Sequence, residues 1–459
     1  MKCGVVKAKK CVTGSLRIDP SFFLSEAVVA RSTLGSSPNG VLSICQCADK
    51  VFWGNIFTRI YVRDAEHGVP YLAASDTILS NLNTGTYLSK KQAKELNYLM
   101  LQKDWIVVTC SGTVGNVTYT NANYENHIAT QDLIRIIPNN EQIRRGVLYA
   151  FLASKYGYHQ LTQSMYGGVV KHISPDHVNK IIIPIFTDDL QLEVDELIRE
   201  TAALREKANT ALQSAISYLK EVIDVPFNTT VSKTAKVSIK NIRESLTSRI
   251  DPPAFINEGV YSMEYMRYHY PFKTLEDTNS KIYRPGIFKR VYVSKGIPYI
   301  KGSEIFNTNP FKSCDNLSLT RTPFVEQMKL HEGQILITCA GSVGRVKMIT
   351  KEYEDKASIG SQDIIRLESN DNLFTKEYLF AYLQLPFVQD YIQSMKYGSV
   401  IERIEPFHIE SIPIVVPTKE LSEQISTLIR SYMTHTYRAF KCEEQAIKLV
   451  ENEIDSWTK

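Results

Sequence analysis

Two short glycine-containing stretches are the first places where this sequence could hold a ligand. Gly112-Thr113-Val114-Gly115 and Gly341-Ser342-Val343-Gly344 each follow an apolar run of strand-forming residues. A phosphate-binding loop needs more glycines and a lysine, which neither stretch has. We therefore expect hairpins in which glycine supplies positive φ or close backbone approach. The polar residues that flank them are candidates to face a ligand: Ser111, Asn116, Ser342 and Arg345.

The sequence shows no catalytic or metal-binding arrangement. Asp251-Pro252-Pro253-Ala254 is similar to the Asp-Pro-Pro-aromatic loop of adenine-N6 methyltransferases, but Phe255 comes one place late and no glycine-rich turn for S-adenosylmethionine accompanies it. We interpret it as a tight turn. Ser111-Gly112 lacks the Gly-x-Ser-x-Gly pattern of a nucleophile elbow. The eight cysteines and nine histidines do not have zinc-ligand spacing. We expect reduced thiols, no metal, and structural hydrogen bonding for His177 and His408.

Basic and aromatic residues recur in segments that resemble loops. Residues 164–172 and 394–403 each combine one or two glycines, a tyrosine and basic side chains. Such groups suit contacts with phosphates or base edges, although a solvated loop would have the same composition. Together with two arginines beside expected strands, the candidates for such contacts are Arg59, Tyr166, Lys171, His172, Arg290, Lys396, Tyr397 and Arg403.

These segments belong to a tandem duplication. Six landmarks recur in the same order, with offsets near 230 residues. They begin at Arg17 and Arg249, Ile56 and Ile287, Val69 and Ile297, Thr109 and Thr338, Gln131 and Gln362, and Gln163 and Gln393. Residues 27–52 have no obvious counterpart in the second half, so their role stays open.

Each repeat ends in a long segment without proline or glycine, at 187–224 and from 418 to about 457. Apolar residues recur there at spacings of mostly four and three, which is typical of a coiled-coil seam. The seam residues are Leu190, Val194, Leu197, Leu204, Leu219, Leu421, Ile425, Leu428 and Leu449. We predict that the two helices pair with each other. The alternative is that each packs only on its own domain.

The predicted fold class is α+β, with two mixed domains that are each followed by a long helix. Strands are expected near 105–109, 133–137, 334–338 and 363–367, and short helices near 89–101, 145–162 and 376–394. The predicted boundaries are a first domain at 1–186, a helix at 187–224, a linker and second domain at 225–417, and a helix at 418–459.

The composition is that of a globular protein. Of 459 residues 43% are hydrophobic, and the net charge is +4. Apolar runs fall far short of the ~20 residues that a membrane span needs, and no signal peptide is visible, so we expect a cytoplasmic protein. The small net charge neither requires nor excludes nucleic acid.

The order of the landmarks resembles the DNA-specificity (S) subunit of type I restriction–modification systems. The similarity covers nearly the whole chain. It is best in the second half, where Ile412-Pro413-Ile414-Val415-Val416-Pro417 leads into Glu423-Gln424-Ile425. The first half departs from the pattern with Leu190-Gln191-Leu192.

The resemblance implies two target-recognition domains that each read one half of a split, asymmetric DNA site. It also implies an antiparallel pair of helices and two partner methyltransferase subunits that carry S-adenosylmethionine, in a complex that restriction/translocase subunits can join. The chain itself is then a non-catalytic recognition subunit without a cofactor or metal. A helix of 38 residues would span about 57 Å and so set the spacer between half-sites.

Three alternatives stay open. The chain could serve a related system in which methylase and nuclease are fused in one partner. It could be a self-sufficient adenine-N6 DNA methyltransferase, or a coiled-coil scaffold without a DNA role.

Overall fold

The computed structural model describes residues 23–163, 165, 171–226, 234, 236–244 and 249–457. The contacts divide the chain into two compact units. Unit 1 contains Met1–Glu206 together with Arg438–Lys459, and unit 2 contains Lys207–Tyr437. This division differs from the predicted boundaries, because each long helix contributes one segment to each unit.

The described residues of unit 1 form three sheets. A four-stranded sheet has the order β2-β9-β6-β7, a second has the order β3-β5-β4-β8, and β1 pairs with β10. The strands are β1 (Val41–Ser43), β2 (Ala48–Phe52), β3 (Tyr61–Val62), β4 (Gly68–Leu72), β5 (Tyr87–Ser89), β6 (Ile106–Thr109), β7 (Val117–Tyr119), β8 (Ile128–Ala129), β9 (Leu133–Pro138) and β10 (Ile182–Pro184). All pairs are antiparallel except β4 with β8.

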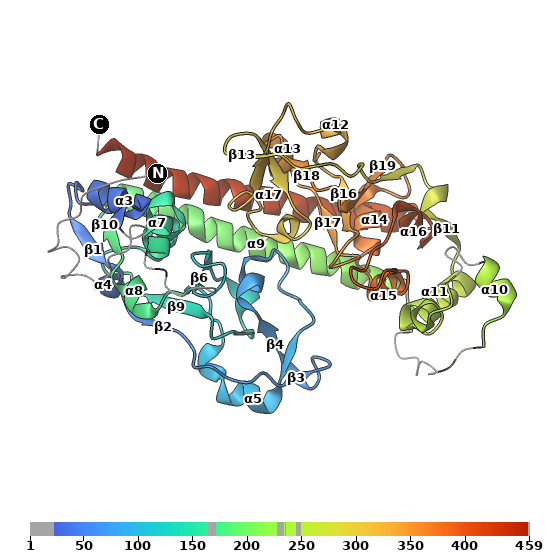
Figure 1. Cartoon of the computed structure of the whole chain (residues 1–459). Helices are drawn as coiled ribbons and strands as arrows, with labels where there is room; N and C mark the ends of the chain where they lie inside the picture. Colours follow the sequence, from blue (N-terminus) through green and yellow to red (C-terminus); the bar gives the residue numbers. More distant parts are fainter. Residues whose placement is uncertain are drawn as a thin grey trace. The chain divides into compact units, whose positions relative to one another are not determined.

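Helices cover these sheets and connect them. Figure 1 shows α3 beside α7, and the two helices are in contact. The helices are α3 (Glu26–Leu34), α4 (Ile44–Cys47), α5 (Lys90–Glu95), α6 (Arg145–Ala153), α7 (Lys155–Gln163), α8 (Pro175–Asn179) and α9 (Asp188–Val222), with 3-10 turns η1 (Ala74–Ile78), η2 (Asn97–Leu99) and η3 (Ala122–Tyr124). The single helix expected at 145–162 is broken at Ser154. Its hydroxyl accepts a hydrogen bond from the Gly157 backbone N–H at 3.3 Å.

Unit 2 repeats the same three sheets in the same strand order: β12-β19-β16-β17, β13-β15-β14-β18 and β11-β20. The strands are β11 (Phe272–Thr274), β12 (Ser280–Tyr283), β13 (Tyr292–Val293), β14 (Ile297–Ile300), β15 (Asp315–Leu317), β16 (Ile335–Thr338), β17 (Val346–Met348), β18 (Ile359–Gly360), β19 (Ile364–Ser369) and β20 (Pro413–Val415). Both β6 and β16 are buried throughout and rich in β-branched residues, which suits a central strand. The duplication and the four predicted strands are therefore confirmed.

The helices of unit 2 follow the same plan. They are α10 (Ile239–Glu244), α11 (Glu258–His269), α12 (Val325–Met328), α13 (Lys351–Asp355), α14 (Lys376–Tyr382), α15 (Pro386–Ser394), α16 (Pro406–Glu410) and α17 (Lys419–Ser456), with 3-10 turns η4 (Pro252–Ala254), η5 (Leu275–Asp277) and η6 (Glu304–Phe306). Pro386 begins α15 and separates it from α14, because proline is favoured in the first turn of a helix and not in its interior.

The structure corrects one expectation about residues 27–52. This segment does have a counterpart in the second half. Strand β1 pairs with β10 as β11 pairs with β20, β2 pairs with β9 as β12 pairs with β19, and α3 packs on α7 as α11 packs on α15. The sequences have diverged while the hydrogen-bonded register has stayed, so sequence comparison missed it.

The two long helices share the cores of both units. In unit 1, the ring of Phe186, just before α9, lies 6.1 Å from that of Trp457, and Thr201 Oγ1 donates to the Ala439 carbonyl at 3.4 Å. The start of α9 is therefore next to the end of α17, so the helices run antiparallel there. In unit 2, Ala208, Ala215 and Leu219 from α9 lie in the same buried cluster as Ile425 and Ile429 from α17.

Candidate functional site

The same three side chains meet at one place in each unit. In unit 1, Arg59 Nε donates to the Tyr71 hydroxyl at 2.6 Å, and its Nη2 lies 3.8 Å from Asp132 Oδ2. In unit 2, Arg290 Nε donates to the Tyr299 hydroxyl at 2.8 Å, and its Nη2 lies 3.3 Å from Asp363 Oδ2. The six residues come from three of the recurring landmarks, which explains why these landmarks recur together.

The arginines of this network keep their charge. The hydrogen bond with Tyr71 is the largest influence on Arg59 and raises its pKa. For Arg290, burial acts to lower the pKa, but its interactions with Tyr299, Tyr292 and Asp363 together outweigh burial and raise it. About a third of each side chain is exposed, 30% for Arg59 and 32% for Arg290. Each is therefore a fixed, partly accessible cation.

A fully buried arginine positions the aspartate of each network. Arg366 on β19 donates from Nη2 to the Gly360 carbonyl and from Nη1 to the Ile364 carbonyl, both at 2.9 Å. These carbonyls flank Asp363 in the chain. Arg135 on β9 makes the matching bonds to Ala129 at 2.9 Å and Leu133 at 3.0 Å. Burial lowers the pKa of Arg135 and of Arg366 to about 10.

In unit 2 the network forms one wall of a cavity of about 430 Å³. Four of the sequence-predicted contact residues line it: Arg290, Ser342, Arg345 and Arg403. The other lining residues are Tyr292, Tyr299, Lys301, Gly302, Ser303, Thr338, Ala340, Gly341, Ser361, Asp363 and Ile401. Tyr299 and Asp363 belong to landmarks that recur in the sequence. Lys301 was not predicted, because its counterpart in the first repeat is Ala73 and the lysine therefore does not recur. We call this cavity the unit 2 cleft.

The turn between β16 and β17 shapes one side of the unit 2 cleft. Gly341 and Gly344 have φ values of 72° and 87°, which only glycine adopts readily. The Arg345 backbone N–H donates to Thr338 Oγ1 at 3.1 Å, and the Arg345 guanidinium lies 3.8 Å from the centre of the Phe306 ring. A cation over the face of an aromatic ring is held there by electrostatic attraction to the ring.

The equivalent turn of unit 1 has the same backbone. Gly112 and Gly115 have φ values of 72° and 95°, so the predicted glycine hairpins are confirmed in both repeats. The Asn116 backbone N–H donates to Thr109 Oγ1 at 3.0 Å. Ser111 forms a backbone bridge with His172, and the Lys171 carbonyl accepts from Gly112 at 3.2 Å. Four predicted contact residues of unit 1 thus lie around this turn.

Lys396 and Tyr397 do not line the unit 2 cleft, but the backbone of Tyr397 pairs with that of Arg403, which does line it. Lys396 Nζ is 2.5 Å from Glu402 Oε2. The Tyr397 hydroxyl donates to Glu405 at 2.8 Å, and 40% of Tyr397 is exposed. Tyr166 lies outside the described residues, as does the landmark that begins at Arg17.

The expected seam residues differ in burial. Val194, Leu204, Leu219, Leu421 and Ile425 are buried, whereas Leu190, Leu197, Leu428 and Leu449 are half-buried. The stripe therefore faces the protein interior on average. That it forms a continuous coiled-coil seam stays a prediction.

The two recurring histidines take part in local hydrogen bonds, and the described cysteines form no disulfide. Nδ1 of His177 accepts from the Ser174 backbone N–H at 3.1 Å, and Nδ1 of His408 accepts from that of Glu405 at 3.0 Å. The cysteines within the described ranges are free; Cys3 and Cys11 lie outside them. The same part of the chain contains no group of three or more His, Cys, Asp or Glu that could hold a metal ion. No described helix is long and apolar enough to cross a membrane.

Comparison with known proteins decides the family. The model of the "Type I restriction modification DNA specificity domain" matches residues 58–189 and 276–451, one match in each repeat. The chain belongs to this family. As a DNA specificity protein of type I restriction–modification, it has two copies of the domain that the family shares, and each match contains one Arg–Tyr–Asp network. No curated protein matches the chain.

Solved structures resemble the chain over most of its length. The S subunit of a type I restriction–modification system from M. genitalium is 13% identical, with a TM-score of 0.30, over 91% of this chain and 92% of that one. The HsdS subunit from Thermoanaerobacter tengcongensis is 13% identical, with a TM-score of 0.28, over 92% and 96% of the two chains.

Proposed function

We propose that this chain is the non-catalytic recognition subunit of a type I restriction–modification complex. In this proposal, each unit reads one half of a two-part, asymmetric site in duplex DNA. The observation that carries the proposal is the recurrence of one Arg–Tyr–Asp network beside two glycine turns, within a DNA specificity family, while the residues around it differ between repeats. A shared backbone with different side chains is what two related modules with different targets require.

The chemistry of the unit 2 cleft suits DNA. Arg290, Lys301, Arg345 and Arg403 line it, against Asp363 as the one carboxylate of the lining. Fixed guanidinium groups bind phosphate oxygens or the edge of guanine. We assign the contacts with DNA to this cleft and to the matching turn of unit 1, with Arg59, Ser111, Asn116, Lys171 and His172 as its candidate residues.

The proposed partners are two methyltransferase subunits, with restriction subunits as a further component. S-adenosylmethionine would be bound by the methyltransferase, and this chain would select the adenine that is modified. The proposed docking surface is the pair α9 and α17, whose lengths of 35 and 38 residues correspond to about 50–57 Å. The spacer between half-sites would then depend on the helices and not on the contact residues.

Mapping of methylated adenine in cells tests the proposal. Cells that express the methyltransferase partner with this chain should gain methylation at one two-part motif, and cells without the chain should not. An Arg345→Ala variant should change the preference in only one half of the motif, with Arg321→Ala, an exposed arginine of the same unit, as control. An identical methylation pattern with and without the chain would contradict the proposal.

A further inference from the structure

Each unit has an exposed isoleucine at the same point of one landmark. Ile56 and Ile287 begin the recurring stretch that also contains the network arginine. Their exposed fractions are 91% and 73%, so neither side chain is part of a core. Single exposed apolar side chains are ordinary on protein surfaces. Here, however, the isoleucine recurs although Thr58, two places further on, is replaced by Lys289, which indicates a function that both units share.

The stretch that contains Ile56 is held in place on both sides of this residue. The Asn55 backbone N–H donates to the Tyr98 hydroxyl at 3.3 Å. Further along the chain, the Ile60 backbone N–H donates to Gln92 of α5 at 2.9 Å. Ile56 therefore projects from a fixed backbone, and a side chain that is positioned before binding loses little conformational entropy when a ligand covers it.

The equivalent stretch of unit 2 has the same support. The Ser318 backbone N–H donates to the Val291 carbonyl at 2.9 Å, and in unit 1 the Ser89 backbone N–H donates to the Ile60 carbonyl at the same distance. In both units the phenylalanine that follows the isoleucine packs against a hydrophobic core. The arginine two places after this phenylalanine bonds to the network tyrosine. Only the isoleucine of this group is left mostly exposed.

Both stretches continue into the candidate site. Tyr292, five residues after Ile287, lines the unit 2 cleft. Its equivalent Tyr61 has its ring edge-on at 5.9 Å from that of Tyr71, whose hydroxyl accepts from Arg59. About half of each of the two equivalent tyrosines is exposed. Along the chain, an exposed apolar residue and an exposed aromatic residue thus flank the network arginine in both units.

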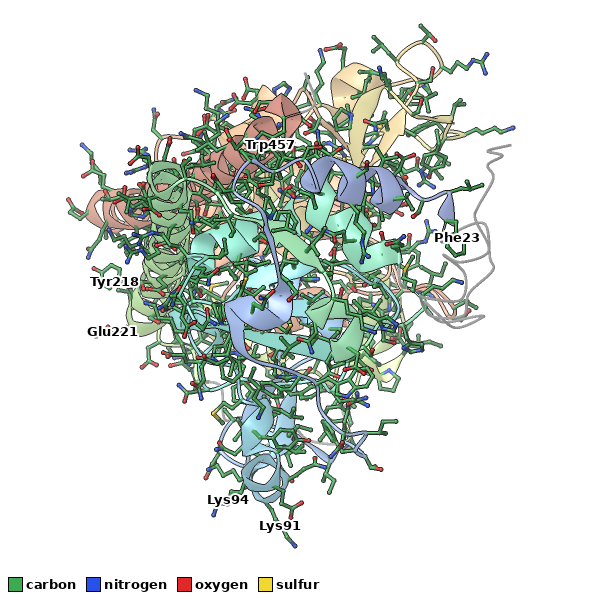
Figure 2. The ribbon with its side chains drawn as sticks, turned by 90° about the vertical axis from the view of Figure 1, so that its left-hand side faces the viewer. Phe23, Lys91, Lys94, Tyr218, Glu221 and Trp457 are labelled. Atoms are coloured by element: carbon green, nitrogen blue, oxygen red, sulfur yellow. The ribbon has the colours of Figure 1, made fainter. Side chains whose placement is uncertain are left out.

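The charge around the isoleucines suits a nucleic acid. Residues 56–63 and 287–294 each include two basic residues and no acidic residue. Helix α5, which supports the unit 1 stretch, adds exposed lysines. Figure 2 shows Lys91 and Lys94 at the tip of unit 1, directed away from it. An apolar tip among cations fits a groove of duplex DNA, where phosphates line both edges and the bases lie between them.

The recurrence also indicates what kind of contact the isoleucine makes. Two units with different half-sites need different side chains wherever a base edge is read. A side chain that enters between neighbouring base pairs depends on how easily they unstack, and much less on the groups that their edges present. Isoleucine is one of the apolar residues that act as such wedges. A residue that stays the same in both units therefore fits a wedge better than a base reader.

We propose that Ile56 and Ile287 are wedges that enter a groove of duplex DNA and partly unstack one base step in each half-site. The inference rests on the proposed DNA-binding function and deepens it, because it assigns a contact with DNA to side chains that read no base edge. Since the energy of unstacking differs between base steps, each wedge adds sequence preference at a position that no side chain reads.

The competing occupant of this surface is a methyltransferase subunit. The proposed docking surface for that partner is the pair α9 and α17. Figure 1 shows β3 and α5 on the far side of unit 1 from the start of α9. This placement favours DNA as the occupant, and assembly with the partner in the absence of DNA separates the two.

The first test is the fluorescence of 2-aminopurine, which rises when a base loses its stacking. The probe replaces single purines along the mapped site, other than the adenine that is methylated, in duplexes bound by the full chain with its methyltransferase partner. We expect a rise at one step in each half-site with the wild type. I56A should abolish the rise in one half-site and I287A in the other, whereas I56L and I287L should retain it.

The second test is DNA affinity, measured by fluorescence anisotropy on the same complex. I56A and I287A should each bind the mapped site about tenfold more weakly, because the apolar side chain that binding buries is lost. V29A and I250A remove exposed apolar side chains elsewhere in the two units and should leave the affinity unchanged. All four variants should keep the melting temperature of the wild type, since the altered side chains are exposed.

Three results would overturn the inference while the proposed function stands. The first is wild-type affinity and unstacking in both I56A and I287A. The second is loss of the methyltransferase from these variants in the absence of DNA, which would make this surface a protein interface. The third is a tenfold loss of affinity without any rise in 2-aminopurine fluorescence in the wild type, which would indicate a base-edge contact such as a thymine methyl group. Equal affinity of the wild type for the mapped site and for a duplex that lacks it would instead count against the proposed function.

Discussion

The buried Arg366 provides the sharpest test of how the site is held in place. Its side chain is fully buried and donates to four backbone carbonyls, those of Met328, Gly360, Ser361 and Ile364. The bonds to Gly360 and Ile364 are 2.9 Å long, and the other two are 3.4 Å. An Arg366→Met variant fills similar space but leaves these carbonyls without their donor.

The expected cost follows from the two short bonds. A buried polar group that loses its partner costs about 1–3 kcal/mol, which gives roughly 2–6 kcal/mol for two carbonyls. Removal of a buried charge offsets part of this loss, because burial disfavours the charged guanidinium and lowers the pKa of Arg366 to about 10. We expect a net loss of about 3 kcal/mol, or roughly 6–12 °C in the melting temperature of a domain of this size.

The measurement is thermal unfolding of the full chain, followed by calorimetry and circular dichroism. Arg321→Met makes the same substitution at an exposed site and should change stability by less than about 0.5 kcal/mol. Arg366→Lys should recover only part of the loss, since an ammonium cannot reach two carbonyls with the fork of a guanidinium. If Arg366→Met were as stable as the wild type, the carbonyl bonds would not hold this region together and the reasoning would be refuted.

Three further predictions concern the helix pair, the Asp251 turn and the glycine turn. In unit 1, Glu443→Gln should cost about 2–4 kcal/mol in chemical denaturation, because it breaks the 2.9 Å ion pair with the largely buried Arg205. Asp251 is partly exposed, and its arginine partner lowers its pKa. Asp251→Asn should therefore cost at most about 1 kcal/mol of stability at neutral pH. The difference in stability between variant and wild type should fade as pH falls through that lowered pKa, and a difference that persisted would contradict the reasoning. Gly344→Ala should cost about 1–3 kcal/mol, because the added Cβ would lie 2.8 Å from Ile392 and φ is 87°. Gly341→Ala should cost less, because no atom lies within 4 Å of its added Cβ. Equal melting temperatures of the two variants would contradict this prediction.

The sequence predicted the structural elements that follow from the local residue pattern or from the duplication. The long helices were visible because no proline or glycine interrupts them, and the glycine turns were visible because both repeats have them. The break after α6 was not predictable, since it depends on Gly157, where a Cβ would lie 2.2 Å from the Phe151 carbonyl. Lys301 was missed because Ala73 replaces it in the other repeat. A heptad pattern also does not reveal which core each part of a helix enters, so the division of the helices between units came only from the contacts.

The place of α17 in unit 1 has a consequence for synthesis of the chain. Ala446, Val450 and Ile454 are fully buried in the core that residues 30–202 begin, and Lys155 bonds Asp455 at 2.7 Å across 300 positions of sequence. The N-terminal part of unit 1 therefore leaves the ribosome long before the α17 residues that complete its core are synthesised. Its apolar surface stays exposed to solvent in the meantime. A nascent polypeptide that stalls or terminates before residue 438 should need chaperone protection and be degraded, even though nearly all of its first half is intact.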